Sequence, residues 1–333
     1  MKNDSIALIY RKQKEGRYSM ERLFKPLEAL TTVKRIELPC ELNSISNFVR
    51  LIFFAITIKE TKVHITGDVH YMAFILFWKK VILTIHDLNH YEELSGIKKK
   101  IYGFIWFWLP LKMANVITVI SPYTQKQLNQ YFKCKNEKIY IVDNTFNKII
   151  KKPMNKNNSI YNILVIGTGK NKNLERLVHS IQDICNCHLT IIGILTEYTK
   201  ELIIRNNISF SNYWDLDEEE LADQYNSADV LFFASTKEGF GLPILEAQSI
   251  GLPVITSNTT AMPYVAGQGA FLVNPYCQTE IANSLKRIKK DEKFRANIIS
   301  QGYRNIERFS DSKFVKDYCL IYKLLSNKNK TLV

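Results

Sequence analysis

Two glutamates, Glu238 and Glu246, separated by seven residues, are the strongest chemical feature of the sequence. The apolar run Asp229–Ala234 (DVLFFA) precedes them and is typical of a buried parallel strand. Gly239–Leu242 then predict a turn that opens a helix, with Pro243 in its first turn. Backbone N–H groups at such a helix start favour an anion such as a diphosphate. Two carboxylates beside an anion site predict a ligand with hydroxyls and phosphate, as in a sugar nucleotide.

Alternating strands and helices must position these residues. Candidate strands are Ser5–Tyr10, Val63–Thr66, Val81–Ile85, Val116–Ile120, Ile139–Val142 and Tyr161–Ile166. Strands separated by segments of helical length predict doubly wound parallel sheets, whose ligands bind beyond the carboxyl ends of the strands. His86 stands at one such strand end, and His64 and His70 are further candidates to line a cleft.

A chain of 333 residues favours two α/β domains over one. We expect an N-terminal domain at 1–150, a second domain at 151–311 and a C-terminal helical segment at 312–333. The polar, basic stretch Asn147–Ser159 suits a linker between the domains. The six cysteines show no disulfide-framework spacing, so we expect buried, reduced thiols. With no signal-peptide pattern at the start, these features predict a cytoplasmic protein.

The positive charge is concentrated in the first half. Residues 1–150 contain 23 Lys and Arg against 13 Asp and Glu, a net charge of +10 out of +13. No apolar run approaches the roughly 18–20 residues that span a bilayer. Ile101–Leu111 (IYGFIWFWLPL) follows three lysines, which suits peripheral contact with an anionic membrane. A core helix with a solvated basic first turn is the alternative, although Trp106 and Trp108 cannot share one narrow buried stripe.

Two other classes of ligand find little support. The sequence has no nucleic-acid-binding motif beyond its positive charge, so we expect no nucleic-acid partner. Asp215-x-Asp217 could indicate a metal–nucleotide site, but it precedes a run of acids that is typical of a helix start. We therefore interpret it as structural and predict no metal site and no metal requirement.

The glutamate pair, followed by Gly251–Ile255 (GLPVI) and Thr256–Asn258 (TSN), resembles the motif of retaining glycosyltransferase family 4. The resemblance covers most of the chain. It implies the GT-B fold, with two Rossmann-like domains facing a cleft and the last helix crossing back to the first domain. It also implies that Glu238 contacts the donor sugar and Glu246 holds the ribose hydroxyls, beside the turn of Gly239, Phe240, Gly241 and Leu242. His86, in Thr84–Asp87 (TIHD), matches a histidine that hydrogen-bonds the donor sugar.

The segment Gly167–Leu174 (GTGKNKNL) resembles the phosphate-binding turn of the same family. The resemblance assigns Lys172 to neutralise the charge on the leaving diphosphate, with Lys170 as a helper and Gly167 and Asn173 in the turn. The segment is neither a dinucleotide fingerprint, because the third glycine is missing, nor a P-loop. It departs from the family in lacking an arginine soon after Gly167, and a second departure places Tyr264 where a glutamate is usual.

The resemblance implies a retaining hexosyltransferase that moves a sugar from a nucleotide-diphosphate sugar to a glycan or polyprenyl-linked glycan, as in bacterial surface polysaccharide assembly. The first domain would bind the acceptor and the second the donor. No cofactor is expected. A sugar-nucleotide epimerase with the same fold and a non-catalytic nucleotide-sugar-binding protein remain alternatives.

Overall fold

A computed structural model describes residues 5–13, 19–134, 136–152, 160–182 and 184–326. The chain divides into two compact units, residues 1–145 with 311–333, and residues 146–310. It therefore enters the second unit at residue 146 and returns to the first at residue 311, close to the boundaries expected at 151 and 312.

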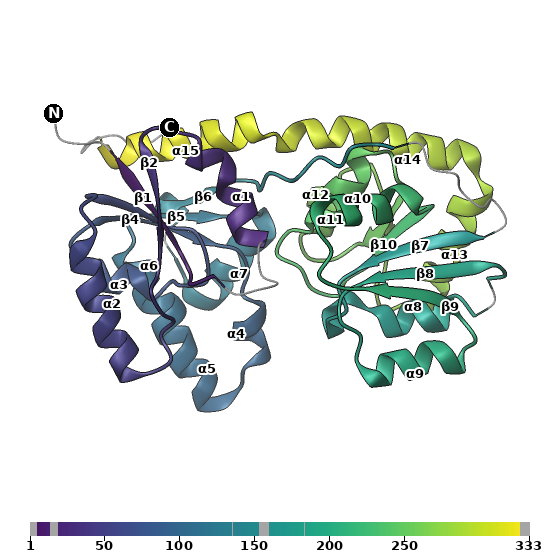
Figure 1. Cartoon of the computed structure of the whole chain (residues 1–333), viewed down its shortest axis with the longest axis horizontal. Helices are drawn as coiled ribbons and strands as arrows, with labels where there is room; N and C mark the ends of the chain where they lie inside the picture. Colours follow the sequence, from purple (N-terminus) through teal and green to yellow (C-terminus); the bar gives the residue numbers. More distant parts are fainter. Residues whose placement is uncertain (1–4, 14–18, 135, 153–159, 183, 327–333) are drawn as a thin grey trace. The chain divides into compact units, whose positions relative to one another are not determined.

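The first unit is built on a six-stranded parallel sheet (Figure 1). Its strands are β1 (Ile6–Tyr10), β2 (Val33–Glu37), β3 (Lys62–Ile65), β4 (Lys80–Ile85), β5 (Val116–Val119) and β6 (Ile139–Ile141), in the order β2-β1-β3-β4-β5-β6. The central strands are covered on both faces, which explains their continuous rather than alternating apolar sequences.

Helices cover both faces of this sheet. One layer consists of α2 (Ile45–Thr57), α3 (Met72–Ile75), α4 (Asn89–Glu93), α5 (Gly96–Tyr102), the π-helix η1 (Gly103–Trp108), α6 (Leu109–Met113) and α7 (Pro122–Phe132). The opposite face is covered by α1 (Ser19–Glu28) and α15 (Asp311–Ser326), whose Phe24, Phe314 and Tyr318 pack against Ile82 and Val116 (Figure 1). A short 3-10 turn, η2 (Asn136–Lys138), precedes β6.

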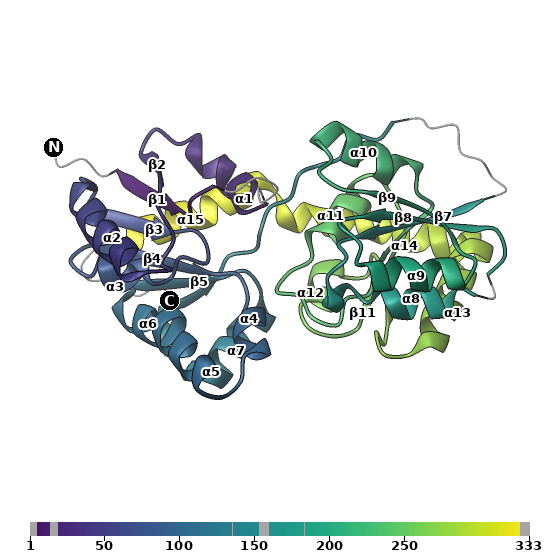
Figure 2. The same cartoon turned by 60° about the horizontal axis from the view of Figure 1, so that its bottom comes forward.

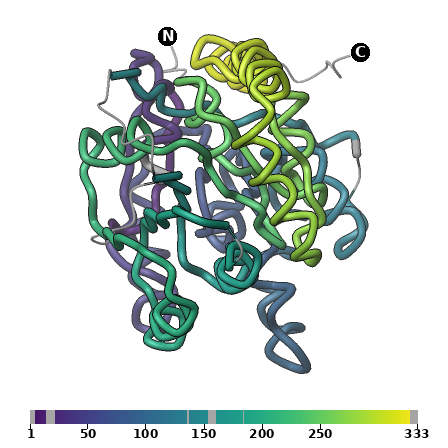
Figure 3. The backbone as a smooth tube through the Cα atoms, turned by 90° about the vertical axis from the view of Figure 1, so that its right-hand side faces the viewer, coloured from purple at the N-terminus to yellow at the C-terminus, as the bar shows by residue number. Residues whose placement is uncertain are grey.

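The second unit repeats this architecture (Figures 2 and 3). Its strands are β7 (Tyr161–Ile166), β8 (Cys187–Ile192), β9 (Ser209–Tyr213), β10 (Val230–Phe233), β11 (Val254–Ser257) and β12 (Phe271–Val273), in the order β12-β11-β10-β7-β8-β9. Its helical segments are η3 (Lys170–Lys172), α8 (Leu174–Ser180), α9 (Glu197–Arg205), α10 (Glu218–Ser227), α11 (Leu242–Ser249), α12 (Met262–Ala266), α13 (Gln278–Lys290), α14 (Glu292–Asn305) and η4 (Ile306–Phe309). The strand order reverses between β7 and β10, and ligands of doubly wound sheets bind at such a reversal.

The predicted doubly wound parallel sheets are therefore confirmed in both units. The expectation of buried thiols is wrong for Cys185, which is exposed, and holds fully only for Cys40; all six cysteines are free. None of the helices within the described residues combines the length and the apolarity that crossing a bilayer requires.

Candidate donor-binding site

The turn after β7 is shaped by a glycine that makes room for a lysine. Gly167 has a φ of +89°, which favours glycine, and a Cβ built on it would lie 2.8 Å from Cε of Lys172. Its N–H donates to the carbonyl of Ile192 at 2.8 Å, which fixes the turn to β8. A side chain at residue 167 would therefore displace Lys172.

Lys172 and Glu238 form an ion pair at the carboxyl ends of β7 and β10. Nζ of Lys172 lies 2.5 Å from Oε1 of Glu238 and 4.5 Å from the centre of the Phe233 ring. The amide of Asn171 also donates to Oε1 of Glu238, at 3.2 Å, and to the carbonyl of Lys237 at 3.0 Å. The structure thus brings together two residues that the sequence assigned to separate motifs. Because both side chains are only partly exposed, their interaction is less screened than a surface pair.

Asn173 and Lys170 differ in their surroundings. Asn173 is buried in a left-handed conformation, and its amide donates to the carbonyls of Ala234 and Pro275 at 3.0 and 2.7 Å. Its side chain therefore ties the turn to β10, while its predicted contact with donor remains a prediction. Lys170 is exposed at a cavity of about 320 Å³, which Arg176 and Tyr276 also line.

Arg176 was not predicted as a site residue. Its Nη1 donates to the carbonyl of Pro275 at 3.1 Å, and its guanidinium lies 5.4 Å from the centre of the Tyr276 ring. It lies four residues after Lys172, in α8, and supplies a second cationic group beside Lys170. The sequence could have indicated Arg176 as a site residue, because it lies within one helical turn of the predicted phosphate-binding segment.

The turn after β10 is equally constrained. Gly241 has a φ of +112°, and a Cβ there would meet Ile244 at 3.2 Å and Phe233 at 3.3 Å. Phe240 is buried and contacts Phe309 edge to face, with ring centres 5.7 Å apart. Gly239 is buried, and Leu242 begins α11. Phe240 thus anchors the turn, and α11 directs the positive end of its dipole to this edge of the sheet.

Glu246 lies in the second turn of α11 and is oriented by Tyr225. The hydroxyl of Tyr225 donates to Oε2 of Glu246 at 2.5 Å. Burial, and then the neighbouring Glu246, raise the pKa of Tyr225 well above its usual value, so the phenol stays protonated and acts as the donor. Tyr225 escaped prediction because its helix carries it to Glu246 from a different part of the sequence.

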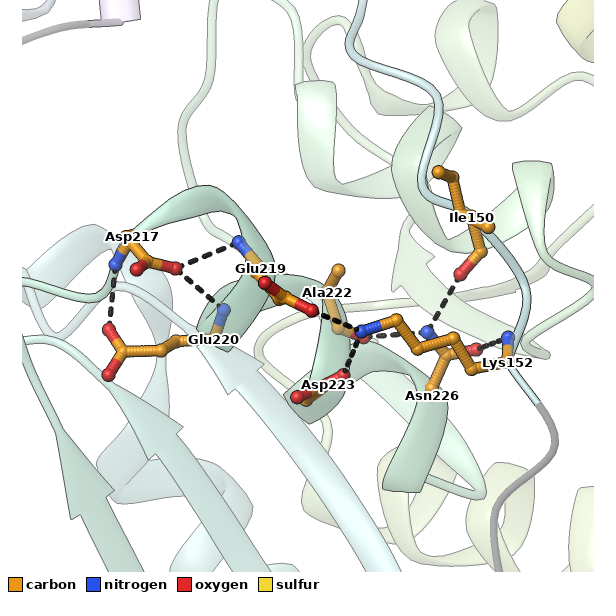
Figure 4. Close-up of polar contacts among 8 residues, drawn as sticks. All are labelled: Ile150, Lys152, Asp217, Glu219, Glu220, Ala222, Asp223 and Asn226. Atoms are coloured by element: carbon orange, nitrogen blue, oxygen red, sulfur yellow. Dashed lines mark hydrogen bonds and ion pairs between the residues drawn. The ribbon is translucent and has the colours of Figure 1, made fainter.

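The helix that carries Tyr225 is fixed at both ends (Figure 4). Asp217 accepts hydrogen bonds from the N–H groups of Glu219 and Glu220, and the Glu220 carboxylate accepts from the N–H of Asp217, which completes a capping box. The structure thus shows Asp217 as the cap of this helix, as expected for an acid at a helix start. Near the other end, Asn226 bonds the backbone of Ile150 and Lys152, and Lys152 pairs with Asp223 at 2.9 Å and Glu219 at 3.1 Å. The described part of the predicted linker is therefore attached to α10, whereas residues 153–159 lie outside the described residues.

Two buried serine hydroxyls add polar capacity at this edge of the sheet. Ser235 follows β10 and Ser257 ends β11, and both side chains are fully buried. Neither hydroxyl finds a hydrogen-bond partner within the described part of the chain. Buried hydroxyls are normally paired, so bound water or a ligand is the expected partner here.

His86 belongs to the first unit, where it follows β4. Its Nε2 lies 2.7 Å from the carbonyl oxygen of Thr66, which can only accept, so Nε2 carries the proton. Burial lowers the pKa of His86, while the Thr66 hydrogen bond and Asp87 act in the opposite direction. In the neutral ring Nδ1 is then an acceptor, suited to a hydroxyl group.

His64 and His70 do not line a cleft, contrary to the expectation. His64 is fully buried between Tyr322 of α15, at 2.9 Å, and Thr84 of β4, at 2.7 Å. His70 is buried too, with Nδ1 2.9 Å from the carbonyl of Trp106. Both histidines join elements within the core of the first unit. No three His, Cys, Asp or Glu side chains in the described ranges gather closely enough to hold a metal ion.

The chain is similar to one family model and to several known proteins. A family model described as "Glycosyl transferases group 1" matches residues 146–305. O-antigen chain mannosyltransferase B of Escherichia coli is 33% identical over 108 residues, which cover 32% of this chain and 28% of that protein. O-antigen chain mannosyltransferase RfbU of Salmonella typhimurium is 23% identical over 62% of this chain and 60% of its own length. An uncharacterized 41.2 kDa protein in the cps region of Klebsiella pneumoniae is 30% identical over 73% of this chain and 71% of its own.

Solved structures agree in fold. Anabaena Alr3699/HepE in complex with UDP-glucose aligns with a TM-score of 0.78 and 15% identity over 96% of this chain and 99% of that one. Sucrose-phosphate synthase from Thermosynechococcus elongatus aligns with a TM-score of 0.77 and 17% identity over 97% and 99%. The chain has the GT-B fold. Together with the family match, the parallel sheets and the glutamate motif, these similarities show that the chain belongs to the group 1 glycosyl transferases.

Proposed function

We propose that the chain is a retaining glycosyltransferase of family 4 that moves a hexose from a nucleotide-diphosphate sugar to a glycan or lipid-linked glycan. The observation that carries the proposal is the meeting of Lys172 and Glu238 at the switch point of the second sheet, beside the start of α11. A cation, a carboxylate and a helix start at one sheet edge suit a ligand with a diphosphate and hydroxyl groups. The mannosyltransferase names of the Escherichia coli and Salmonella relatives support a hexosyl donor and surface polysaccharide assembly.

The donor would be held by charge at the diphosphate and by hydrogen bonds at the ribose. Lys172, Lys170 and the start of α11 would stabilise the diphosphate, and Glu246 would accept hydrogen bonds from the ribose hydroxyls. Tyr225 supports this role because it holds the Glu246 carboxylate in one orientation. The complex of the Anabaena neighbour with UDP-glucose supports a nucleotide-sugar ligand for this fold.

Transfer would follow same-face attack. The acceptor oxygen bonds to the anomeric carbon as the bond from that carbon to the diphosphate breaks, and the acceptor proton passes to a leaving diphosphate oxygen. Glu238 and the Nδ1 acceptor of His86 would orient sugar hydroxyls. Lysines and the helix dipole would stabilise the leaving diphosphate, so we propose that activity needs no metal ion and persists in a chelator. Proton NMR of the product's anomeric centre tests retention.

We propose a cytoplasmic site of action, peripheral to the inner membrane face, where a polyprenyl-linked acceptor would be presented. The basic segment at Lys98–Lys100 beside the aromatic η1 supports this location. The first unit would bind the acceptor and the second the donor.

Thermal shift with UDP, GDP, ADP, CDP and dTDP tests donor binding. Ligand at a hundredfold excess over its dissociation constant stabilises by about 2.7 kcal/mol, a readily measured shift. We expect one diphosphate to stabilise the wild type and Glu246→Ala to lose that shift. Glu201→Ala, at an exposed glutamate on α9, is the matched control and should keep it. Equal shifts in both variants would contradict the role of Glu246.

Product analysis separates this function from its alternatives. A transferase consumes sugar nucleotide in proportion to acceptor, releasing the nucleoside diphosphate. An epimerase would convert the donor to a second sugar nucleotide without acceptor, and a binding protein would leave it unchanged.

A further inference from the structure

The outer side of α2 presents apolar residues to solvent. Ile45, Val49, Phe53 and Ile56 are between 44% and 84% exposed. Their spacing of four, four and three residues places them on one face of the helix. The buried Leu51 on the other side anchors α2 in the core.

A second exposed ridge runs along α5 and η1. Ile97, Ile101, Phe104 and Trp108 are between 40% and 74% exposed, again at spacings of three and four. The rings of Phe104 and Trp108 stack with centres 5.0 Å apart, and Nζ of Lys112 lies 3.9 Å from the centre of the Trp108 ring. Trp106, in contrast, turns inward, donating to the carbonyl of Asp68 and stacking on Tyr102.

The two ridges belong to one helix layer. Between them lies α3, which contacts both α2 and α6 (Figure 2). The residues after α3 include Phe77 and Trp78, whose side chains are exposed. We call these ten exposed side chains the outer apolar surface: Ile45, Val49, Phe53, Ile56, Phe77, Trp78, Ile97, Ile101, Phe104 and Trp108.

The segments that carry this surface have charge of one sign. Residues 45–59, 71–80 and 95–113 contain eight Lys and Arg and no Asp or Glu. Five of the basic side chains are exposed, namely Arg50, Lys59, Lys98, Lys100 and Lys112. A second copy of the same surface would therefore meet it with like charge, which opposes self-association. Exposed Trp and Phe among basic residues instead match the interfacial region of an anionic lipid layer.

We propose that the outer apolar surface docks on a membrane of anionic phospholipid, with α2 and α5–η1 lying at the headgroup level. The inference rests on the proposed peripheral location and not on the chemistry of transfer. It extends the membrane contact from one basic segment to a two-ridge surface in which α2 has an equal part.

Cosedimentation with vesicles of phosphatidylglycerol and phosphatidylcholine tests the docking. The apolar variant combines Phe53→Ser and Ile101→Ser, whose side chains are 68% and 55% exposed. Its matched control combines Tyr198→Ser and Ile204→Ser on α9, whose side chains are 62% and 55% exposed. A charge variant, Lys98→Gln with Lys100→Gln, is matched by Lys286→Gln with Lys290→Gln on α13. The nucleoside diphosphate thermal shift reports the fold and the donor site of every variant.

We expect wild type and both controls to bind the anionic vesicles. The apolar variant should partition at least roughly tenfold less and the charge variant roughly fivefold less per lysine, both with the thermal shift intact. Absence of wild-type binding, or equal binding by the variants, would overturn docking while leaving the proposed transferase function standing. If the wild type were a dimer, and the apolar variant alone were a monomer with unchanged vesicle binding, the surface would be assigned to self-association instead. If no nucleoside diphosphate shifts the melting temperature of the wild type, the donor site is refuted and the docking proposal is not.

Discussion

Replacing His64 with glutamine should remove a defined part of the acid sensitivity of the first unit. Burial, and then the nearby His86, lower the pKa of His64 from 6.5 to about 3. The unfolded chain binds a proton at this position below pH 6.5, whereas the folded protein does so only near pH 3. The stabilisation is therefore complete above pH 6.5 and is lost as the pH falls towards 3.

The size of the effect follows from the shift. At pH 5, about 1.5 pH units below the pKa of the unfolded histidine, this residue is protonated in the unfolded chain and neutral in the folded protein. Protonation stabilises the unfolded chain, and at about 1.36 kcal/mol per pH unit it lowers the free energy of unfolding by about 2 kcal/mol. A glutamine in place of His64 cannot titrate, and its amide retains hydrogen-bonding capacity toward Thr84 or Tyr322. The loss of unfolding free energy between pH 7 and pH 5 should thus be about 2 kcal/mol smaller in His64→Gln. His70 and His86 are present in both proteins, so their own burial terms cancel in the comparison, and only the interaction of His86 with His64 is removed together with His64.

Urea unfolding at pH 7 and pH 5, followed by tryptophan fluorescence, measures this difference. In a Trp214→Phe background the remaining tryptophans, Trp78, Trp106 and Trp108, all report on the first unit. His90→Gln, at an exposed histidine of the same unit, controls for the substitution itself. An equal pH 7 to pH 5 loss in wild type and His64→Gln would refute the buried, neutral assignment.

Three further predictions concern the second unit. Tyr225→Phe removes a charge-assisted hydrogen bond and should weaken nucleoside diphosphate binding by about 1.5–3 kcal/mol, measured by calorimetry; unchanged affinity would remove Tyr225 from the site. Lys172→Met should lower kcat at least roughly tenfold in a transfer assay, because the leaving diphosphate loses a cation, and normal turnover would contradict that role. Gly241→Ala should destabilise the second unit by roughly 1–3 kcal/mol in denaturant titration, since its φ of +112° is strained for alanine and its Cβ meets two side chains. Gly96→Ala is the control, because Gly96 also has a positive φ but an added Cβ would meet no atom within 4 Å. It should lower the free energy of unfolding by less than Gly241→Ala, and equal losses would attribute the whole effect to the backbone.

Central strands such as β4 and β10 could be predicted because burial on both faces gives them continuous apolar sequences, whereas the short central strand β11 (VITS) was missed. The edge strands β2 (VKRIE) and β9 (SFSNY) were missed, since each has one neighbouring strand and many polar residues. Their strand structure comes from pairing with β1 and β8 rather than from an apolar pattern.

The site shows the same division. Glu238, Glu246 and Lys172 lie within short motifs, and their spacing carried the prediction. Tyr225 was missed because its contact joins two elements, and a hydrogen bond between elements is set by packing rather than by local pattern. His64 and His70 were misjudged for a related reason, because residue type alone does not distinguish a buried histidine from one at a cleft.

The return of the chain to the first unit at residue 311 sets an order for folding during synthesis. Residues 146–310 form one uninterrupted unit, which can fold as soon as it leaves the ribosome. The first sheet cannot complete its core at that stage, since Phe314, Tyr318 and Ile321 on α15 follow residue 310 and are made later. Translation from residue 145 to 326 takes about 10–40 s at typical rates of about 5–20 residues per second. Through that interval Ile82 and Val116 lack their final cover, so the part of the protein made first is the part that completes its core last.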